Sequence, residues 1–134
     1  MPASRRIRAL LPQGFFFVLA IAASPAFATG AVCRAENGGE RITLEVPASP
    51  DPFEFHSAEF DERFRVSAQY LQPAGKLKTY VYDFRGDTAA LIHAAEYRLS
   101  DADCSTHTEG FGLNKIYSRN YEREIFFQCF AVCE

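Results

Sequence analysis

Histidine is the side chain best suited to acid–base chemistry near neutral pH, and this chain has three. His107 lies in a polar segment beside Ser105 and Thr106, where a ligand could reach it. His93 falls in an alternating apolar segment, which favours a histidine packed in the core over a catalytic base. Spacing provides no nucleophile, base and orienting group around either residue, so we predict a protein that is not an enzyme. A small hydrolase would need a pocket that brings His93 or His107 next to a carboxylate.

Acidic side chains occur in short runs, at 59–62 and around Asp101 and Asp103. Paired carboxylates do catalytic work only where burial or proximity shifts one pKa, and these runs are typical of solvated turns. Calcium binding at Asp101, Asp103 and Glu109 would need further oxygen ligands in a loop with the right turn. We therefore predict neither a metal site nor a cofactor.

Aromatic residues are numerous, with nine Phe and six Tyr after residue 28 and no Trp. A small core is not expected to bury all of them, and tyrosine on a sheet face is a good contact residue for proteins and glycans. We predict that a partner-binding surface includes Tyr80, Tyr82, His107, Tyr117 and Tyr121. Core packing and cross-strand pairing are the competing interpretation of the tyrosines.

Four cysteines form an even set without metal-ligand or Cys-x-x-Cys spacing: Cys33, Cys104, Cys129 and Cys133. In an exported chain such a set predicts two disulfides. If Cys129 and Cys133 lie on one extended strand, their Cα atoms are about 13 Å apart, beyond the reach of a disulfide. Each is then expected to pair with Cys33 or Cys104, in either of two arrangements. A C-terminal helical turn would instead allow Cys33–Cys104 with Cys129–Cys133.

Residues 1–28 have the pattern of a cleaved secretory signal peptide. Three arginines precede the apolar segment 14–23, and Ala26 and Ala28 are the small residues that a signal peptidase requires. The apolar segment is shorter than the roughly 20 residues of a membrane-spanning helix, and the bulky residue before Cys33 disfavours a lipid anchor. We predict cleavage after Ala28 and a periplasmic or extracellular protein with no stable membrane anchor.

Removal of residues 1–28 makes the chain more acidic. Three of the 14 basic residues and none of the 17 acidic residues lie there, so residues 29–134 carry a formal charge of −6. This charge disfavours nucleic acids and anionic lipids as partners and mildly favours a cationic protein. Solubility alone is the simpler explanation of the same charge.

Alternating apolar residues predict several short strands in the mature chain. The ranges are 41–46, 53–56, 77–84, 113–119 and 122–133.

The segments 59–71 and 88–97 fit both a strand and a helix. In the first, residues 63–71 alternate and a turn leads on to the next strand, so we predict a β-hairpin. In the second, Leu91 and His93 share one face if the chain is extended, and we again predict a strand. Helices over the two segments are the alternatives.

Residues 29–134 are predicted to form one domain. The segment 122–133 is apolar on both faces, which is typical of a central strand covered on both sides. The proline-rich segment 47–52 predicts an extended connector. About six or seven short strands joined mostly by turns predict a small antiparallel β-sandwich or open barrel, allowing for one helix and held by two disulfides.

These features predict a secreted or periplasmic, non-enzymatic binding protein of the inhibitor or immunity type, which caps a protein partner. Small size, acidity, disulfides and the surplus of tyrosine favour this function. The alternative is a structural or accessory subunit of an envelope or surface assembly, in which an exposed edge strand pairs with a neighbouring subunit.

Overall fold

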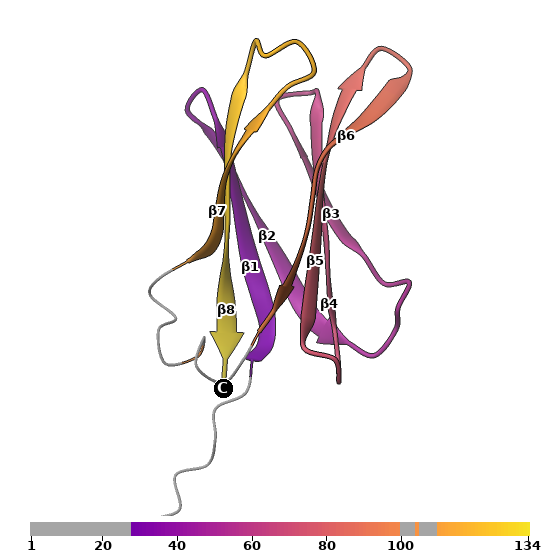
Figure 1. Ribbon diagram of the computed structural model, residues 1–134, viewed down its shortest axis with the longest axis vertical. Helices are drawn as coiled ribbons and strands as arrows, with labels where there is room; N and C mark the ends of the chain where they lie inside the picture. Colours follow the sequence, from indigo (N-terminus) through magenta and orange to yellow (C-terminus); the bar gives the residue numbers. More distant parts are fainter. Residues whose placement is uncertain (1–27, 100–103, 105–109) are drawn as a thin grey trace, which may run out of the picture.

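The computed structural model describes residues 28–99, 104 and 110–134 (Figure 1). They form eight strands: β1 (Ala28–Asn37), β2 (Glu40–Ser49), β3 (His56–Phe60), β4 (Phe64–Leu71), β5 (Lys76–Arg85), β6 (Thr88–Arg98), β7 (Phe111–Tyr117) and β8 (Glu124–Cys133). The mainly β fold is confirmed, with more strands than the six or seven expected. In these ranges no helix is long and apolar enough to cross a membrane.

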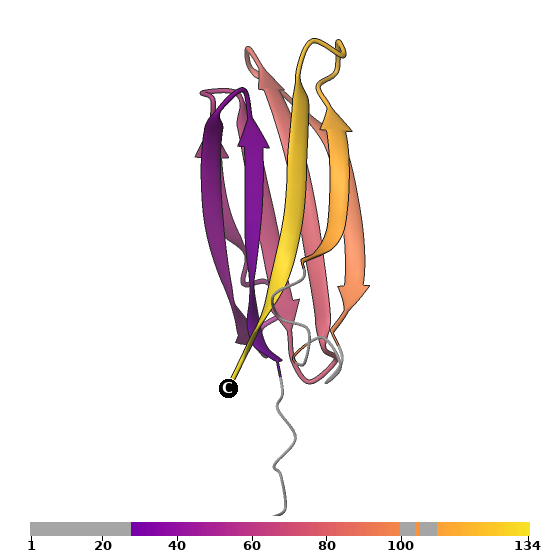
Figure 2. The same cartoon turned by 90° about the vertical axis from the view of Figure 1, so that its left-hand side faces the viewer.

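The strands lie in two facing layers (Figure 1). One has the order β2-β1-β8-β7, seen from its outer side in Figure 2, and the other has the order β3-β4-β5-β6. A short parallel pairing, which includes Ala48 opposite Tyr70, joins β2 to β4. At the other side β6 lies next to β7, where Asn114 Nδ2 donates a hydrogen bond to Tyr97 Oη (3.1 Å). The fold is therefore a β-sandwich whose sheet nearly closes into a barrel.

Both segments for which a helix was the alternative are strands. β4 pairs with β5 along its whole length, and its inward residues Phe64, Val66 and Ala68 are at most 1% exposed. β6 also pairs with β5, from Thr88 to Arg98. Extended backbone prevails because it lets alternate side chains fill the space between the two layers, which outweighs the weak local preference for a helix.

A β-bulge in β6 corrects the predicted orientation of one residue. Val81 pairs with His93 but Tyr82 pairs with Leu91, which leaves Ile92 as an extra residue. The extra residue shifts the alternation of side chains across the sheet. Leu91 is therefore turned outward and is 53% exposed, so the expectation that it shares a face with His93 is wrong.

The segment between β2 and β3 also differs from expectation. β2 continues through Pro47 to Ser49, so the extended connector is shorter than predicted. The strand predicted at 53–56 begins only at His56. The reason is a turn in which the Asp51 carboxylate accepts a hydrogen bond from the Phe53 amide (2.8 Å), leaving Phe53 87% exposed.

β8 is central in its sheet but is covered on one face only. Its inward residues Ile125 and Phe127 are fully buried, whereas Phe126 and Val132 on the outer face are 43% and 41% exposed. The prediction of cover on both sides is therefore wrong for the residues that the structure describes. Phe126 is instead partly screened by the Lys115 ammonium, 5.2 Å from its ring centroid.

The two disulfides are Cys33–Cys129 and Cys104–Cys133, one of the two arrangements expected from an extended C-terminal strand. Cys33 and Cys129 lie opposite each other on β1 and β8, with their Cα atoms 4.0 Å apart. Both bridges thus attach β8 to earlier parts of the chain.

β1 begins at Ala28, the last residue of the predicted signal peptide. Ala28 is 6% exposed and pairs with Cys133. Its carbonyl oxygen accepts hydrogen bonds from Tyr70 Oη (3.3 Å) and Gln72 Nε2 (3.2 Å). The other residues of the predicted signal peptide lie outside the described residues, and cleavage after Ala28 stays a prediction.

Candidate functional site

The most distinctive surface of the molecule is a row of aromatic side chains on the outer face of the β3-β4-β5-β6 layer. β5 directs Leu77, Thr79, Val81 and Asp83 fully into the interior, so the residues between them face outward. Ring centroids are 6.0 Å apart between Phe55 and Tyr80, 6.5 Å between Tyr80 and Tyr82, and 6.4 Å between Tyr82 and Phe84. We call these four residues the aromatic row: Phe55, Tyr80, Tyr82 and Phe84.

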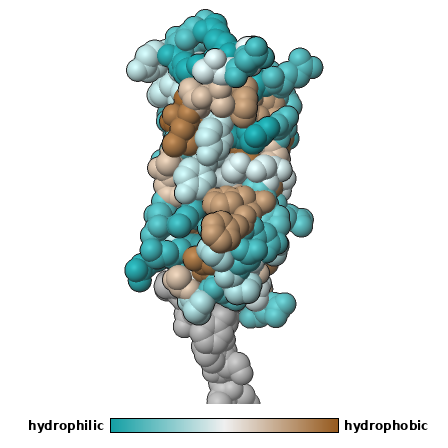
Figure 3. Space-filling view, turned by 90° about the vertical axis from the view of Figure 1, so that its right-hand side faces the viewer, coloured by the Kyte–Doolittle hydropathy of each residue, from teal (hydrophilic) through white to brown (hydrophobic). Residues whose placement is uncertain are grey.

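A cation and an apolar residue extend the aromatic row sideways. The Arg65 guanidinium lies 4.6 Å from the centroid of the Phe84 ring, and Glu59 accepts a hydrogen bond from Arg65 Nε (3.0 Å). Leu91, exposed by the bulge, is the cross-strand neighbour of Tyr82. Figure 3 looks onto this side of the molecule and shows brown and pale side chains among hydrophilic ones. Exposed aromatic and arginine side chains are typical of protein contact surfaces.

One end of the aromatic row borders a shallow hollow of about 320 Å³. Its walls include Tyr80 and the charged residues Lys78 and Glu96. The Lys76 ammonium lies 2.8 Å from a Glu96 oxygen. The hydrogen bond from Lys76 holds the pKa of the Glu96 carboxyl below its ordinary value, so this carboxylate is ionised at neutral pH.

The predicted binding residues do not form one site. Tyr80 and Tyr82 are neighbours in the aromatic row, whereas Tyr117 and Tyr121 form a separate pair at the end of β7, in the other layer, with ring centroids 6.1 Å apart. Tyr121 is 81% exposed. His107 lies outside the described residues, as do the acidic residues of its loop. The structure thus divides the predicted tyrosines into two distinct surfaces.

His93 lies on the inner side of β6, where its ring centroid is 5.9 Å from that of Phe127. Burial lowers the pKa of His93, so the imidazole is neutral at pH 7. Among the described residues its Nε2 atom has no hydrogen-bond partner. This environment is that of a core residue, and no carboxylate among the described residues is paired with it.

A buried ion pair closes one end of the sandwich. The Asp83 carboxylate is inaccessible to solvent and accepts hydrogen bonds from Arg63 Nε (2.7 Å) and Arg63 Nη2 (2.9 Å). The backbone amide of Arg119 donates a third hydrogen bond (3.0 Å). The hydrogen bonds from Arg63 hold the pKa of Asp83 below its ordinary value despite the opposing effect of burial. Because the carboxylate is enclosed, this pair connects the turn before β4, strand β5 and the turn after β7 rather than offering a reactive group.

The described residues include no group of three or more His, Cys, Asp or Glu side chains placed to hold a metal ion. The sequence analysis named Tyr80 and Tyr82 as contact residues, which stays a prediction, and did not name their three neighbours on this face: Phe55, Arg65 and Phe84. Phe84 carried a signal, because it continues the same two-residue period along β5. No sequence pattern places Phe55 beside Tyr80 or Arg65 beside Phe84, because these contacts depend on how β3 and β4 pack against β5.

No family model matches the chain, and the searches found no curated protein or solved structure that it resembles. The class is defined by the structure alone: a small β-sandwich with two disulfides and an outer sheet face that carries a row of aromatic side chains, of which Phe55 is exposed and the other three are partly exposed.

Proposed function

We propose that this protein is an exported, non-enzymatic binding protein that caps a protein partner with the aromatic row. The observation that carries the proposal is the continuous line of Phe55, Tyr80, Tyr82 and Phe84 on an outer sheet face. Aromatic rings held on a rigid sheet lose little conformational entropy on binding and bury a large apolar area. The two disulfides are compatible with an oxidising compartment, which supports export.

The positions of the perturbed ionisable groups favour binding over catalysis. The pKa values of Arg63 and Asp83 are shifted by their mutual ion pair, and that of His93 by burial in the core. Catalytic acids and bases need shifted pKa values in a cleft that a substrate can enter. Glu96 does line the open hollow beside Tyr80, but the hydrogen bond from Lys76 lowers its pKa and keeps the carboxylate ionised, whereas a general acid at neutral pH needs a raised pKa.

We favour a cationic partner on the basis of long-range attraction. The formal charge of −6 over residues 29–134 accelerates encounter with a positively charged protein, and salt screens this effect. At the aromatic row itself the charges are mixed, with Arg65 held by Glu59. Aromatic contact is therefore expected to provide most of the affinity, and net charge most of the association rate.

The experiment compares two matched double variants of the oxidised protein as bait against an envelope extract. Tyr80→Ala/Tyr82→Ala removes the centre of the aromatic row, and Tyr117→Ala/Tyr121→Ala removes the other tyrosine pair. We expect one stoichiometric partner for the wild type and for the second variant, with at least tenfold less captured by the first. Equal capture by both variants would refute the aromatic row as the binding surface. If the partner is cationic, less of it should be captured at high salt. The association rate constant, measured separately with the purified partner, should fall as the salt concentration rises.

The alternative, an accessory subunit that pairs through an edge strand, has less support from the geometry. β6 and β7 end the seven-strand order and both contain a register shift, and β3, which pairs only with β4 among the described strands, is five residues long. Bulged edges are poor templates for a further strand. Side chains also bridge the two edges, because Arg119 Nη2 donates a hydrogen bond to the Thr88 carbonyl (3.3 Å).

A further inference from the structure

The hollow beside Tyr80 has walls of three chemical kinds: aromatic, aliphatic and charged. In the pairing of β5 with β6, Ala94 lies opposite Tyr80, and because an alanine side chain ends at Cβ, the space beside the ring stays open. Lys78 and Glu96, the next pair on the same face, form the charged wall. The volume of about 320 Å³ is at the lower end of the range of roughly 300–1,000 Å³ for ligand sites.

Positive charge exceeds negative charge around this hollow, although the chain as a whole is acidic. Three cations lie near one carboxylate, because the pKa of Glu96 is lowered first by the hydrogen bond from Lys76 and also by the charges of Lys78 and Arg98. Only Lys76 forms an ion pair with Glu96 (2.8 Å), so within the described part of the chain the charges of Lys78 and Arg98 are not paired. The hollow therefore attracts an anionic group.

The Glu96 carboxylate places a second requirement on a ligand. An ionised carboxylate only accepts hydrogen bonds, and its two oxygens offer more acceptor sites than one lysine occupies. The Glu96 side chain is 46% exposed, so a ligand can reach it. A ligand that brings only a carboxylate is repelled by Glu96, whereas one that also carries hydroxyl groups can donate hydrogen bonds to it.

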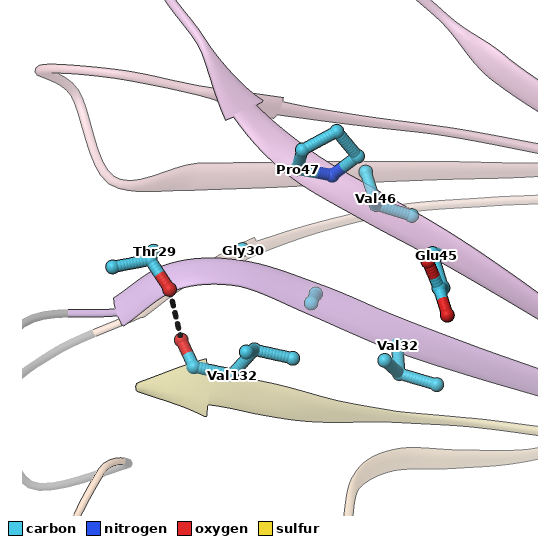
Figure 4. Close-up of a pocket in the computed structure, with 8 residues that line it drawn as sticks. Thr29, Gly30, Val32, Glu45, Val46, Pro47 and Val132 are labelled. Carbon is cyan, nitrogen blue, oxygen red and sulfur yellow. Dashed lines mark hydrogen bonds between the residues drawn. The ribbon is translucent and has the colours of Figure 1, made fainter. Parts of the chain in front are cut away.

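A larger groove, of about 460 Å³, lacks this combination of groups. Figure 4 shows it between β1, β2 and the end of β8, with Val32, Pro47 and Val132 among its walls. Among the described residues that line it, none is aromatic or basic, and Glu45 is the one with a charge. The Thr29 hydroxyl already donates a hydrogen bond to the Val132 carbonyl (3.3 Å). We expect no anionic ligand in this groove.

We propose that the hollow beside Tyr80 binds a uronic acid, the acidic sugar unit of anionic saccharides. The sugar carboxylate pairs with Lys78 and Arg98, and its hydroxyl groups donate hydrogen bonds to Glu96. The apolar face of the sugar ring packs against the Tyr80 ring. An acidic peptide fits less well, because an aspartate or glutamate side chain has no hydroxyl group to donate to Glu96. The proposal does not rest on the proposed function, although the two share Tyr80.

The test titrates the purified, oxidised protein with trigalacturonic acid and follows the backbone amide signals by NMR at constant ionic strength. The matched probe is the methyl ester of the same trisaccharide, which keeps the rings and hydroxyl groups but has no charge. We expect saturable shifts at residues 78–80 and 94–96, and at least tenfold lower affinity for the ester.

Three variants locate the site. Lys78→Gln and Tyr80→Ala should each lower the affinity for trigalacturonic acid at least fivefold. Lys115→Gln is the matched control, since the Lys115 ammonium also lies near an aromatic ring, that of Phe126 (5.2 Å), but on the other layer. It should leave the affinity unchanged. Thermal unfolding identifies any loss of fold, and Lys78→Gln remains as a probe if Tyr80→Ala is unstable.

Three results would overturn the proposal: no saturable binding at millimolar saccharide, equal affinity for the acid and its ester, or equal weakening by Lys115→Gln and Lys78→Gln. Equal affinity for a triglutamate peptide would also overturn it, because the site would then recognise charge without the sugar. Tyr82→Ala separates this proposal from the proposed function. That variant should capture less of the protein partner but bind trigalacturonic acid as the wild type does.

Discussion

Replacement of Asp83 by asparagine is the sharpest test of how this sandwich is held together. The substitution keeps the shape of the side chain but removes the charge that accepts two hydrogen bonds from Arg63 and one from the Arg119 amide. Because the Asp83 side chain is inaccessible to solvent, water cannot replace it as the partner of Arg63. Arg63 is left with one carboxylate, that of Glu122, at 3.5 Å.

The expected cost is large relative to the stability of a small domain. Breaking a buried ion pair by removing one partner costs about 3–5 kcal/mol. We expect about 3 kcal/mol, the lower end of that range, because Arg63 is 15% exposed and keeps its contact with Glu122. For a domain of this size the loss corresponds to a fall in Tm of roughly 12–24 °C. Urea unfolding of the oxidised protein measures the free energy directly.

The control and the pH dependence make the prediction specific. Glu122→Gln removes a carboxylate whose side chain is 51% exposed, and should change stability by less than about 1 kcal/mol. Since the folded pKa of Asp83 is lowered, its contribution is complete above the ordinary aspartate pKa and is lost as the pH falls through the folded pKa. The wild type should therefore lose more stability than Asp83→Asn below about pH 4. A variant as stable as the wild type at pH 7 would refute the reasoning.

Three further outcomes can be checked on the same protein. Replacing both cysteines of Cys33–Cys129, which closes a span of 96 residues, should cost about 4–5 kcal/mol in urea unfolding, and unchanged stability would contradict an entropic role. A chain that begins at Thr29 should be less stable than one that begins at Ala28 by about 1–2 kcal/mol, because Tyr70 and Gln72 lose an acceptor; equal Tm values would show that this contact is unimportant. Because the folded pKa of His93 is lowered, the wild type should lose stability as the pH falls below about 6.5, and His93→Gln should flatten that slope; parallel pH profiles would refute the assignment.

The fold was predictable where the pattern of neighbouring residues is compatible with only one secondary structure or one set of disulfides. Apolar and polar residues alternate over residues 64–71, which predicted the strand, although the alternation did not predict that Ser67 and Gln69 on its other face are buried too. The extended C-terminal strand excluded the pairing of Cys129 with Cys133. The bulge in β6 was not predictable, because Leu91, Ile92 and His93 can all face the core. Alternating residues lie on the same face of a sheet only as long as the strand contains no bulge.

The candidate site was predictable only within single strands. Tyr80 and Tyr82 share a face of one strand, so their proximity follows from the two-residue period. The burial of Asp83 on the same strand was not predicted, and its partner Arg63 could not be identified without the hairpin register. The separation of Tyr117 from Tyr80 depends on strand order, which no local pattern contains.

The order of the cysteines along the chain sets a problem for the maturation of this protein. A chain that crosses a membrane amino end first delivers Cys33 and Cys104 before Cys129 and Cys133, and the first two are not partners in the folded domain. An oxidising enzyme acting during that interval would join the wrong thiols. For the export proposed above, correct maturation requires either that oxidation waits for the last few residues or that an isomerase exchanges the first bond. A chain truncated just before β8 would acquire neither native crosslink.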